Sequence, residues 1–220
     1  MITTYNLERS FHDGEVETKI LKGINFRAEN GEFIAIMGRS GAGKSTFLYQ
    51  LSLLDEPTAG EIIIDGVDTH LMSPEEKTNF RLSQFGFVFQ DYALLPEMTA
   101  LENVALPLLM QNKTRAEAYA KAREALIKVK LEKRLDNLPS QLSGGEQQRV
   151  SIARAVAHQQ KILFADEPTA NLDNESSRTV MGIFSDLHRA GQTIIMVTHE
   201  EEYAKLAQKI IRLDDGKIVV

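Results

Sequence analysis

The sequence contains no cysteine, no tryptophan and no long run of apolar residues. Without cysteine, disulfides, thiolate catalysis and cysteine-ligated zinc are excluded, and the chain carries no marker of its redox compartment. A membrane-spanning helix needs roughly 20 consecutive, mostly apolar residues, whereas the apolar runs of this chain are only long enough for strands. We therefore expect any role at a membrane to depend on a partner.

Basic residues are fewer than acidic ones, 25 against 31, and the formal net charge is -6. Proteins that bind nucleic acid usually carry a basic face or stripe, so no nucleic-acid partner is expected. The first residues, Met1 to Arg9, are broken by polar and charged side chains, unlike a secretory signal or a transit peptide. A length of 220 residues with 43% hydrophobic content predicts one compact domain spanning the chain.

Short apolar runs recur along the chain, and each ends abruptly at a glycine or a polar residue. Such runs are typical of buried parallel strands. They cover residues 33–37, 87–89, 162–165 and 194–197. Helical patterns lie between them, and residues 180–187 show one apolar stripe with helical spacing. The alternation predicts an α/β fold with a mainly parallel core sheet.

Two regions depart from this alternation. Strand-like residues 2–7, 19–28 and 61–65, with turn signals such as Asp65-Gly66, predict an antiparallel β part. From about Leu101 to Leu138 helix-forming residues dominate, and Thr114 is a candidate helix cap. The predicted organisation is therefore a core of about 1–90 and 160–220, with a helical subdomain of about 91–159. A last hairpin turn is expected at Asp215-Gly216.

Residues 38–45, Gly-Arg-Ser-Gly-Ala-Gly-Lys-Ser, fit the pattern G-x-x-x-x-G-K-[ST] between an apolar strand and a helix-like segment. Glycines let the backbone N–H groups of such a loop turn toward phosphates, and the helix start adds partial positive charge. Lys44 is expected to contact the β- and γ-phosphates and Ser45 to ligate Mg²⁺. The alternative is a flexible glycine loop at a helix start. The predicted nucleotide-binding residues of this loop are Gly38, Arg39, Ser40, Gly41, Ala42, Gly43, Lys44, Ser45 and Thr46.

Asp166 and Glu167 follow another apolar run. Asp166 is placed to hold Mg²⁺ through water, as strand-end acids of phosphate-loop NTPases do, and Glu167 to orient and deprotonate the attacking water. Carboxylates after strands are mostly just solvated, so the phosphate loop is what favours the metal interpretation. Ligands of open parallel sheets bind outside the carboxyl ends of the strands. Gly38, Gln90, Asp166, Glu167 and His199 are therefore expected to converge on one crevice.

Residues 142–149, Leu-Ser-Gly-Gly-Glu-Gln-Gln-Arg, precede a helical run and offer N–H groups at a second helix start. Such a start is a second candidate anion site, although an ordinary capped helix would have the same residues. Together with a complete phosphate loop, the motif predicts that Ser143, Gly144 and Gly145 bind the γ-phosphate of an ATP held by a second chain.

The order of these motifs along the chain resembles that of a known protein family. The phosphate loop, Gln90, residues 142–146, Asp166-Glu167, Asn171-Leu-Asp173 and His199 follow one another as in ABC transporter nucleotide-binding domains, over essentially the whole chain. The Leu-Ser-Gly-Gly signature is the specific element, because many unrelated NTPases share the phosphate loop.

The resemblance also assigns roles to isolated residues. It implies that Phe11 stacks on adenine, without the hydroxyl of the commoner tyrosine; a core phenylalanine is the alternative. It implies that Gln90 contacts Mg²⁺ and the attacking water and relays movement toward the membrane subunit; the alternative is a plain polar cap after a strand. It implies that His199 contacts the γ-phosphate; the alternative is a structural histidine. Asp173 would lie in a loop that couples the two sites of a dimer, or would cap a helix over 174–189.

By this resemblance the chain is an ATPase that uses ATP and Mg²⁺ and closes head to tail with a second copy of itself. It would drive a separate membrane subunit from the cytoplasmic face of the inner membrane. The implied catalytic residues are Lys44, Gln90, Glu167 and His199, and the implied metal ligands are Ser45, Gln90 and Asp166. Residues 53–60 and 86–107 resemble the macrolide-exporter, lipoprotein-releasing and peptide-resistance branch. Arg39, where proline is frequent, keeps a cell-division ATPase as the alternative.

Three further classes fit the sequence less well. A DNA-repair or chromosome-organising ATPase head is split by a very long coiled coil, whereas 98 residues (142 − 44) separate Lys44 from Leu142. An ABC-type translation factor would carry two cassettes, and a nucleotide kinase would have no use for the signature. The cargo and the direction of transport are not encoded here, because substrate contacts in such systems lie in the membrane subunit.

Overall fold

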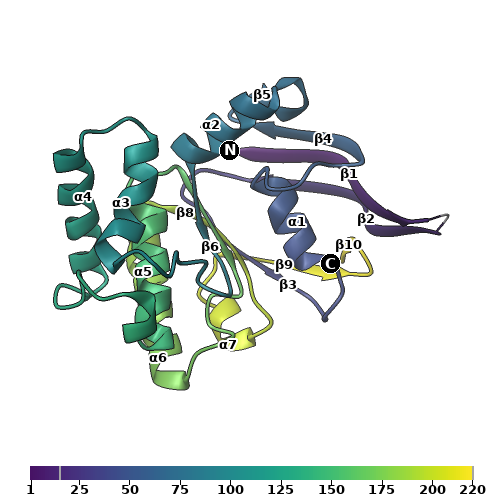
Figure 1. Cartoon of the computed structure of the whole chain (residues 1–220). Helices are drawn as coiled ribbons and strands as arrows, with labels where there is room; N and C mark the ends of the chain where they lie inside the picture. Colours follow the sequence, from purple (N-terminus) through teal and green to yellow (C-terminus); the bar gives the residue numbers. More distant parts are fainter. Residues whose placement is uncertain (15, 220) are drawn as a thin grey trace. The chain divides into compact units, whose positions relative to one another are not determined.

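The computed structural model describes residues 1–14 and 16–219, which fall into two compact units (Figure 1). The first unit comprises Met1–Arg81 and the segment from Gly191 onward, and the second comprises Leu82–Ala190. The fold is α/β, with parallel and antiparallel strands, as the sequence predicts. The predicted helical subdomain of 91–159 has other boundaries than the second unit and stays a prediction.

An antiparallel sheet of strand order β2-β1-β4-β5 opens the first unit. β1 (Ile2–Asp13) and β2 (Val16–Ala28) form a long hairpin, and β1 also pairs with β4 (Ala59–Ile64). A turn at Asp65-Gly66, with φ of 50° and 81°, leads into β5 (Val67–Asp68). The antiparallel part is thus confirmed. Its first two strands are longer than predicted, because their hairpin ends are polar and exposed and give no apolar signal.

Two parallel strands of the first unit, β3 (Phe33–Met37) and β8 (Thr193–Val197), are buried throughout, whereas β9 (Lys209–Asp214) is mostly exposed. β3 lies between β8 and β9 and runs parallel to both. β10 (Lys217–Val219) returns antiparallel to β9, which confirms the last hairpin. The helical segments are α1 (Lys44–Leu51), η1 (Thr69–Leu71), α2 (Pro74–Gln84), which runs into the second unit, and α7 (Glu201–Ala204).

The second unit combines the parallel pair β6 (Phe85–Val88) and β7 (Ile162–Asp166) with helices. The helices are α3 (Ala100–Met110), α4 (Arg115–Lys128), η2 (Pro139–Gln141), α5 (Gly144–Val156) and α6 (Asn174–Arg189). α3, α4 and α5 pack side by side (Figure 1). The prediction of a strand over 87–89 was wrong at both ends: pairing runs from Phe85 to Val88, and Phe89 leaves the ladder.

Local capping explains where the helices of the second unit begin and end. Thr114 accepts a hydrogen bond from the N–H of Glu117, which confirms the predicted cap of α4. α4 ends at Lys128, within the region of 101–138 that is predicted as a helical lobe. It ends there because Lys130 is left-handed, with φ of 61°, and the N–H of Leu131 bonds back to the carbonyl of Leu126, a standard helix-ending arrangement.

Candidate functional site

The phosphate loop of the first unit connects β3 to α1, as predicted. Gly43 precedes the helix with φ of 95°, a left-handed conformation that glycine adopts without steric cost. Ile36 pairs with Val197 across β3 and β8, so the loop and His199 both follow the same edge of the parallel strands. His199 is exposed at that edge. The phosphate loop and His199 therefore follow neighbouring strands at their carboxyl ends.

Strands distant in sequence hold this loop from behind. A Cβ atom on Gly38 would lie 2.2 Å from the carbonyl oxygen of Leu213, on β9. The N–H of Gly216, in the last hairpin turn, donates to the carbonyl of Ala42 at 3.3 Å. Gly216 in turn accepts from the N–H of Lys22 at 2.9 Å. The glycines at these positions permit a close backbone approach that no other residue type allows.

Lys44, the lysine of the pattern at residues 38–45, is largely buried against its own loop. Its side chain lies back along the loop, where Nζ donates to the carbonyl of Arg39 at 3.2 Å, and the residue is only 8% exposed. Ser45 follows it in the first turn of α1 and is half-buried. An ammonium group held among loop carbonyls and helix N–H groups can exchange its carbonyl contact for phosphate oxygens.

Phe11 does not belong to the core. It is 46% exposed near the end of β1, and the guanidinium of Arg9 lies 4.4 Å from its ring centroid. Arg9 itself is fixed by two hydrogen bonds to the Asp55 carboxylate, at 2.7 and 2.8 Å. The alternative of a core phenylalanine is wrong, and an exposed aromatic face is available for stacking.

The strand-end acids and Gln90 lie in the second unit. Val88 pairs with Ala165 across β6 and β7, so Gln90 and the acids follow the same edge of this strand pair. Asp166 is 4% exposed. Glu167 has φ of 43°, a left-handed conformation that non-glycine residues rarely adopt and that recurs at functional sites. The convergence of these positions with Gly38 and His199 on one crevice stays a prediction.

The signature motif begins α5. Ser143 is the N-cap: its hydroxyl accepts from the N–H of Glu146, and the Glu146 carboxylate accepts from the N–H of Ser143 at 2.9 Å. Burial raises the pKa of Glu146, but hydrogen bonds from the Ser143 N–H, the Arg134 guanidinium and the Ser143 hydroxyl outweigh it and leave the pKa below its usual value. The capped helix start that the sequence offered as an alternative is thus present. It does not exclude anion binding, because helix geometry still leaves the first N–H groups without intrahelical partners.

A hollow of about 330 Å³ adjoins this helix start. It is lined by Lys130, Ser143, Gly145, Glu146, Arg149, Glu175, Ser176 and Thr179. A Cβ atom on Gly145 would lie 2.5 Å from the hydroxyl oxygen of Ser176, on α6. The second glycine of the motif is therefore required by the packing of two helices as well as by any ligand.

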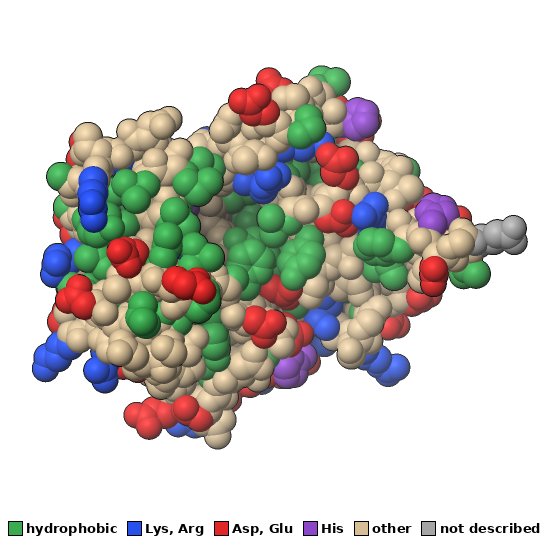
Figure 2. All heavy atoms as spheres, in the orientation of Figure 1, with side chains coloured by type: hydrophobic (Ala, Val, Ile, Leu, Met, Phe, Trp, Pro, Cys, Tyr) green, Lys and Arg blue, Asp and Glu red, His purple; other side chains and the backbone are tan. Residues whose placement is uncertain are grey.

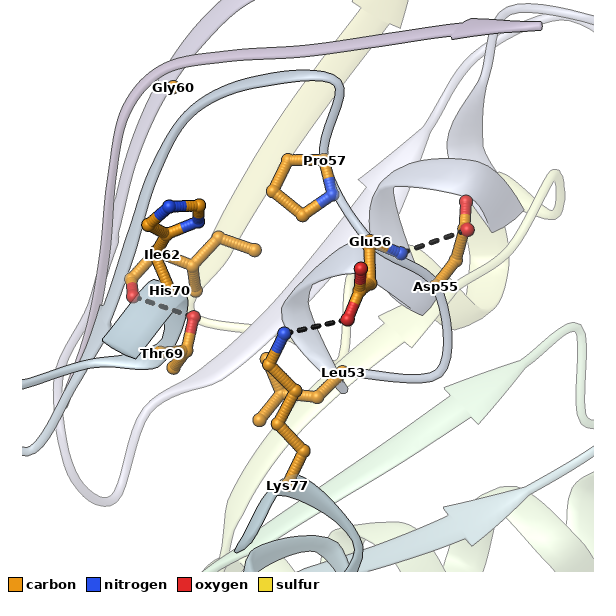
Figure 3. A pocket seen from close by; sticks show the side chains of 9 residues that line it. All are labelled: Leu53, Asp55, Glu56, Pro57, Gly60, Ile62, Thr69, His70 and Lys77. Carbon is orange, nitrogen blue, oxygen red and sulfur yellow. Dashed lines mark hydrogen bonds and ion pairs between the residues drawn. The ribbon is translucent and has the colours of Figure 1, made fainter. Parts of the chain in front are cut away.

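A second cavity, of about 90 Å³, lies in the first unit and contains no predicted site residue (Figure 3). Lys77 of α2 reaches into it to form an ion pair with Glu56 at 2.7 Å. That bond is the largest reason why the pKa of Glu56 is lowered. Thr69 closes another side through a hydrogen bond to the carbonyl of Ile62 at 2.9 Å. These partners satisfy one another, so the cavity is a structural feature of the fold.

The surface carries charged side chains of both signs. On the face shown in Figure 2, lysines and arginines are interspersed with acidic side chains, consistent with the net charge of -6. None of the helices formed by residues 1–14 and 16–219 has the length and apolar character needed to cross a bilayer.

Several residues that shape the site were not predicted. Asn171 was predicted only as part of a motif; its side-chain N–H donates to the carbonyl of Gln90 at 3.3 Å. Arg154 donates to the carbonyls of Tyr92 and Ala93, just after Gln90, and Gly216 donates to the phosphate loop. For Gly216 the Asp-Gly turn was a signal, but nothing in it indicated the loop it contacts.

Comparison with known proteins places these motifs in a family. The family model described as ABC transporter matches residues 21–170. An ABC transporter ATP-binding protein of Methanocaldococcus jannaschii is 50% identical over 219 residues, covering 100% of this chain and 98% of the relative. The lipoprotein-releasing system ATP-binding protein LolD of Aquifex aeolicus is 46% identical, covering 91% of this chain and 90% of LolD.

Further matches are a longer relative and two solved structures. The macrolide export ATP-binding/permease protein MacB of Marinobacter nauticus is 46% identical, but this chain spans only 34% of its length. The dimeric structure of MJ0796, a bacterial ABC transporter cassette, is 40% identical with a TM-score of 0.94 and covers 100% of this chain. MJ0796 in a post-hydrolysis state with ADP and Pi has a TM-score of 0.93. These names do not favour the cell-division alternative.

The family model spans 150 of the 220 residues (170 − 21 + 1), and the Methanocaldococcus jannaschii relative matches over nearly its whole length. The chain therefore belongs to the ABC transporter family, as an ATP-binding and ATP-hydrolysing cassette.

Proposed function

We propose that this cassette is the motor of an exporter or lipoprotein-releasing system and that it dimerises on ATP to change the shape of a separate membrane subunit. The observation that carries the proposal is the presence of two prepared helix starts: α1 with its phosphate loop, and α5 with the signature. A phosphate loop alone serves many NTPases, so the second start is the feature that points to a cassette whose ATP is shared between two copies.

The phosphate loop and the exposed Phe11 would hold the nucleotide. N–H groups of residues 38–46 and the start of α1 bind the phosphates, and Lys44 turns from the Arg39 carbonyl to the β- and γ-phosphates. The Phe11 ring stacks on adenine, and Arg9 keeps the ring in place. His199, at the same strand edge, contacts the γ-phosphate.

Mg²⁺ fits the donors that the chain offers. No group of three or more potential ligands of the His, Asp or Glu type occurs within residues 1–14 and 16–219, so the protein offers no complete cage. Mg²⁺ is usually held by one or two carboxylates with phosphates and water. Asp166 through water, the Ser45 hydroxyl and the Gln90 side chain would hold it. When bound, the ion neutralises charge that develops on the phosphates.

Glu167 would act on the attacking water. Its left-handed backbone turns the chain directly after the buried Asp166, so the two successive carboxylates serve different tasks. Glu167 accepts a proton from water as that water attacks the γ-phosphate, while Lys44 and the loop N–H groups stabilise the phosphate oxygens. Positioning and charge stabilisation account for most of the catalysis.

The signature residues Ser143, Gly144 and Gly145 would bind the ATP of a second copy, so two chains close head to tail around two nucleotides. The dimers described for the related MJ0796 cassette support this. The names of LolD and MacB support a membrane partner of the lipoprotein-release or export type. Such a cassette works at the cytoplasmic face of the inner membrane, where ATP is available.

The test is the solution mass of the Glu167→Gln protein by light scattering, with and without ATP and Mg²⁺. We expect a monomer that becomes a dimer only with ATP, because binding is kept while turnover is lost. Glu124→Gln, an exposed change on α4, is the matched control and should hydrolyse ATP at the parent rate. A Glu167→Gln protein that binds ATP but stays monomeric would contradict the dimer, and parental turnover would contradict the role of Glu167.

A further inference from the structure

The segment that follows β6, residues 89–93, is here called the glutamine loop because it contains Gln90. Its last two residues, Tyr92 and Ala93, are both left-handed, with φ of 61° and 49°. Neither is a glycine, and a left-handed conformation is costly for each of them. Two such residues in succession keep this shape only when the surroundings hold them.

One side chain of the signature helix holds both strained residues. Arg154 projects from α5, and its Nη1 donates to the carbonyl of Ala93 at 2.5 Å. Its Nη2 donates to the carbonyl of Tyr92 at 2.9 Å. Hydrogen bonds from a charged donor are about twice as strong as neutral ones. A single guanidinium thus binds the two carbonyls that the left-handed turn presents.

The rest of the glutamine loop is tied to the same surroundings. Gln148, fully buried on α5, donates through Nε2 to the carbonyl of Pro168 at 2.7 Å and more weakly to that of Phe89 at 3.4 Å. Asn171 donates to the carbonyl of Gln90 and, at 3.2 Å, to the carboxylate of Asp91. Side chains of α5 and of the loop after β7 therefore hold the backbone on both sides of Gln90.

Tyr92 also reaches the start of the signature itself. Its hydroxyl lies where a Cβ atom on Gly144 would approach to 2.9 Å, and it donates to the carbonyl of Asn171 at 3.5 Å. Burial is the main reason why the pKa of the Tyr92 hydroxyl is raised, so it stays protonated. The turn that Arg154 stabilises thus sets the distance between the glutamine loop and the signature motif.

We propose that Arg154 is a positioning residue that fixes the glutamine loop to the signature helix, so that Gln90 and the signature move as one body. The inference rests on the proposed role of Gln90 and adds the residue that keeps it in place. It also gives the strained turn a function. When the hydrogen bonds of Arg154 break, Tyr92 and Ala93 leave the left-handed conformation and Gln90 moves from its position. A movement imposed on the loop by the membrane subunit would reach α5 through the same guanidinium.

The experiment compares Arg154→Met with the parent in steady-state ATP hydrolysis and in hydrogen exchange of the amides at 89–94. Methionine keeps the length and removes both donors. We expect kcat to fall about ten-fold with KM within about two-fold, the signature of an interaction that acts on turnover and not on nucleotide binding. The amides at 89–94 should exchange faster, because the loop opens locally. Arg154→Lys, which keeps one charged donor, should lie between the two.

A second change separates positioning from general stability. Adding Ala93→Gly to the Arg154→Met protein should raise kcat about three-fold or more above that of Arg154→Met alone, because glycine adopts the left-handed turn without cost. Arg81→Met is the matched control: Arg81 donates to the carbonyl of Leu53 at 2.8 Å, and Leu53 is left-handed too, with φ of 57°, but both lie in the first unit. That variant should be less stable to heat at an unchanged kcat.

Three results would overturn the inference. The first is parental kcat and parental hydrogen exchange in Arg154→Met. The second is a loss of kcat that Ala93→Gly does not restore and that Arg81→Met reproduces, since both would then reflect lost stability alone. The third is a change in KM without a change in kcat. Gln90→Ala is measured beside them: if its kcat stays parental, the proposed role of Gln90 fails, while hydrogen exchange still decides whether Arg154 holds the loop.

Discussion

Replacing Gly38 with alanine tests how closely the last strands support the phosphate loop. The added Cβ atom would lie 2.2 Å from the carbonyl oxygen of Leu213. Carbon–oxygen contacts normally lie at about 3.3 Å, so the backbones must separate by about 1 Å. Overpacking of this kind costs about 1–3 kcal/mol. The backbone of Gly38, with φ of 158°, adds about 1–3 kcal/mol for any residue with a side chain.

We therefore expect Gly38→Ala to lower the free energy of unfolding by about 2–6 kcal/mol. For a chain of this size each kcal/mol shifts Tm by about 2–4 °C, so Tm should fall by at least about 4 °C. ATP affinity should fall at least about ten-fold, because the loop N–H groups move away from the positions that cradle phosphates. Thermal unfolding followed by circular dichroism and calorimetric titration with ATP measure the two effects.

The control is Gly41→Ala in the same loop. Gly41 is left-handed, with φ of 78°, but nothing lies within 4 Å of the Cβ it would gain. Gly41→Ala should lower the free energy of unfolding only by the conformational cost of a left-handed alanine, about 1–2 kcal/mol. If Gly38→Ala were as stable as Gly41→Ala and bound ATP like the parent, the reasoning from the Leu213 contact would be refuted.

Two further predictions concern α6. Gly182 is exposed in the middle of this helix with open space around it, so Gly182→Ala should raise the free energy of unfolding by about 0.5–1 kcal/mol in a denaturant titration; a decrease would contradict the helix boundaries. Asp173 caps α6, and hydrogen bonds from the Ser176 N–H and hydroxyl hold its pKa below the usual range. Because the pKa of Asp173 is lowered in the folded state, its carboxylate stabilises the fold above the ordinary aspartate pKa of about 4. That stabilisation is lost as the pH falls through the lower pKa of the folded state. In Asp173→Asn, which caps without titrating, Tm should fall less than in the parent between about pH 6 and about pH 3; equal falls would contradict this.

Much of the fold could be predicted because its signals are local. The apolar runs before Gly38, Asp166 and Thr198 are strands, since a buried parallel strand needs only a few consecutive apolar residues. The caps Thr114 and Asp173 begin their helices as expected, because a cap depends on residues within one turn. The start of α5 at Gly144 follows from Ser143 and Glu146 in the same way.

The interactions that hold the site could not be predicted, because they join residues far apart in the sequence. Arg154 reads as an ordinary helical arginine, and only the structure shows its two carbonyl partners at Tyr92 and Ala93. Those residues carry no glycine that would announce a left-handed turn. The sequence likewise gives no signal for the end of α4 at Lys128, because the left-handed residue that follows is Lys130 and not the usual glycine.

The contact between the last hairpin and the phosphate loop has a consequence for biosynthesis. Ala42 and Gly216 are 174 residues apart (216 − 42) and are joined by a hydrogen bond. A ribosome adds about 5–20 residues per second, so the loop waits roughly 10–35 s for its final support. The phosphate loop is therefore synthesised well before Gly216, and during that interval it lacks the hydrogen bond that supports it from the last hairpin.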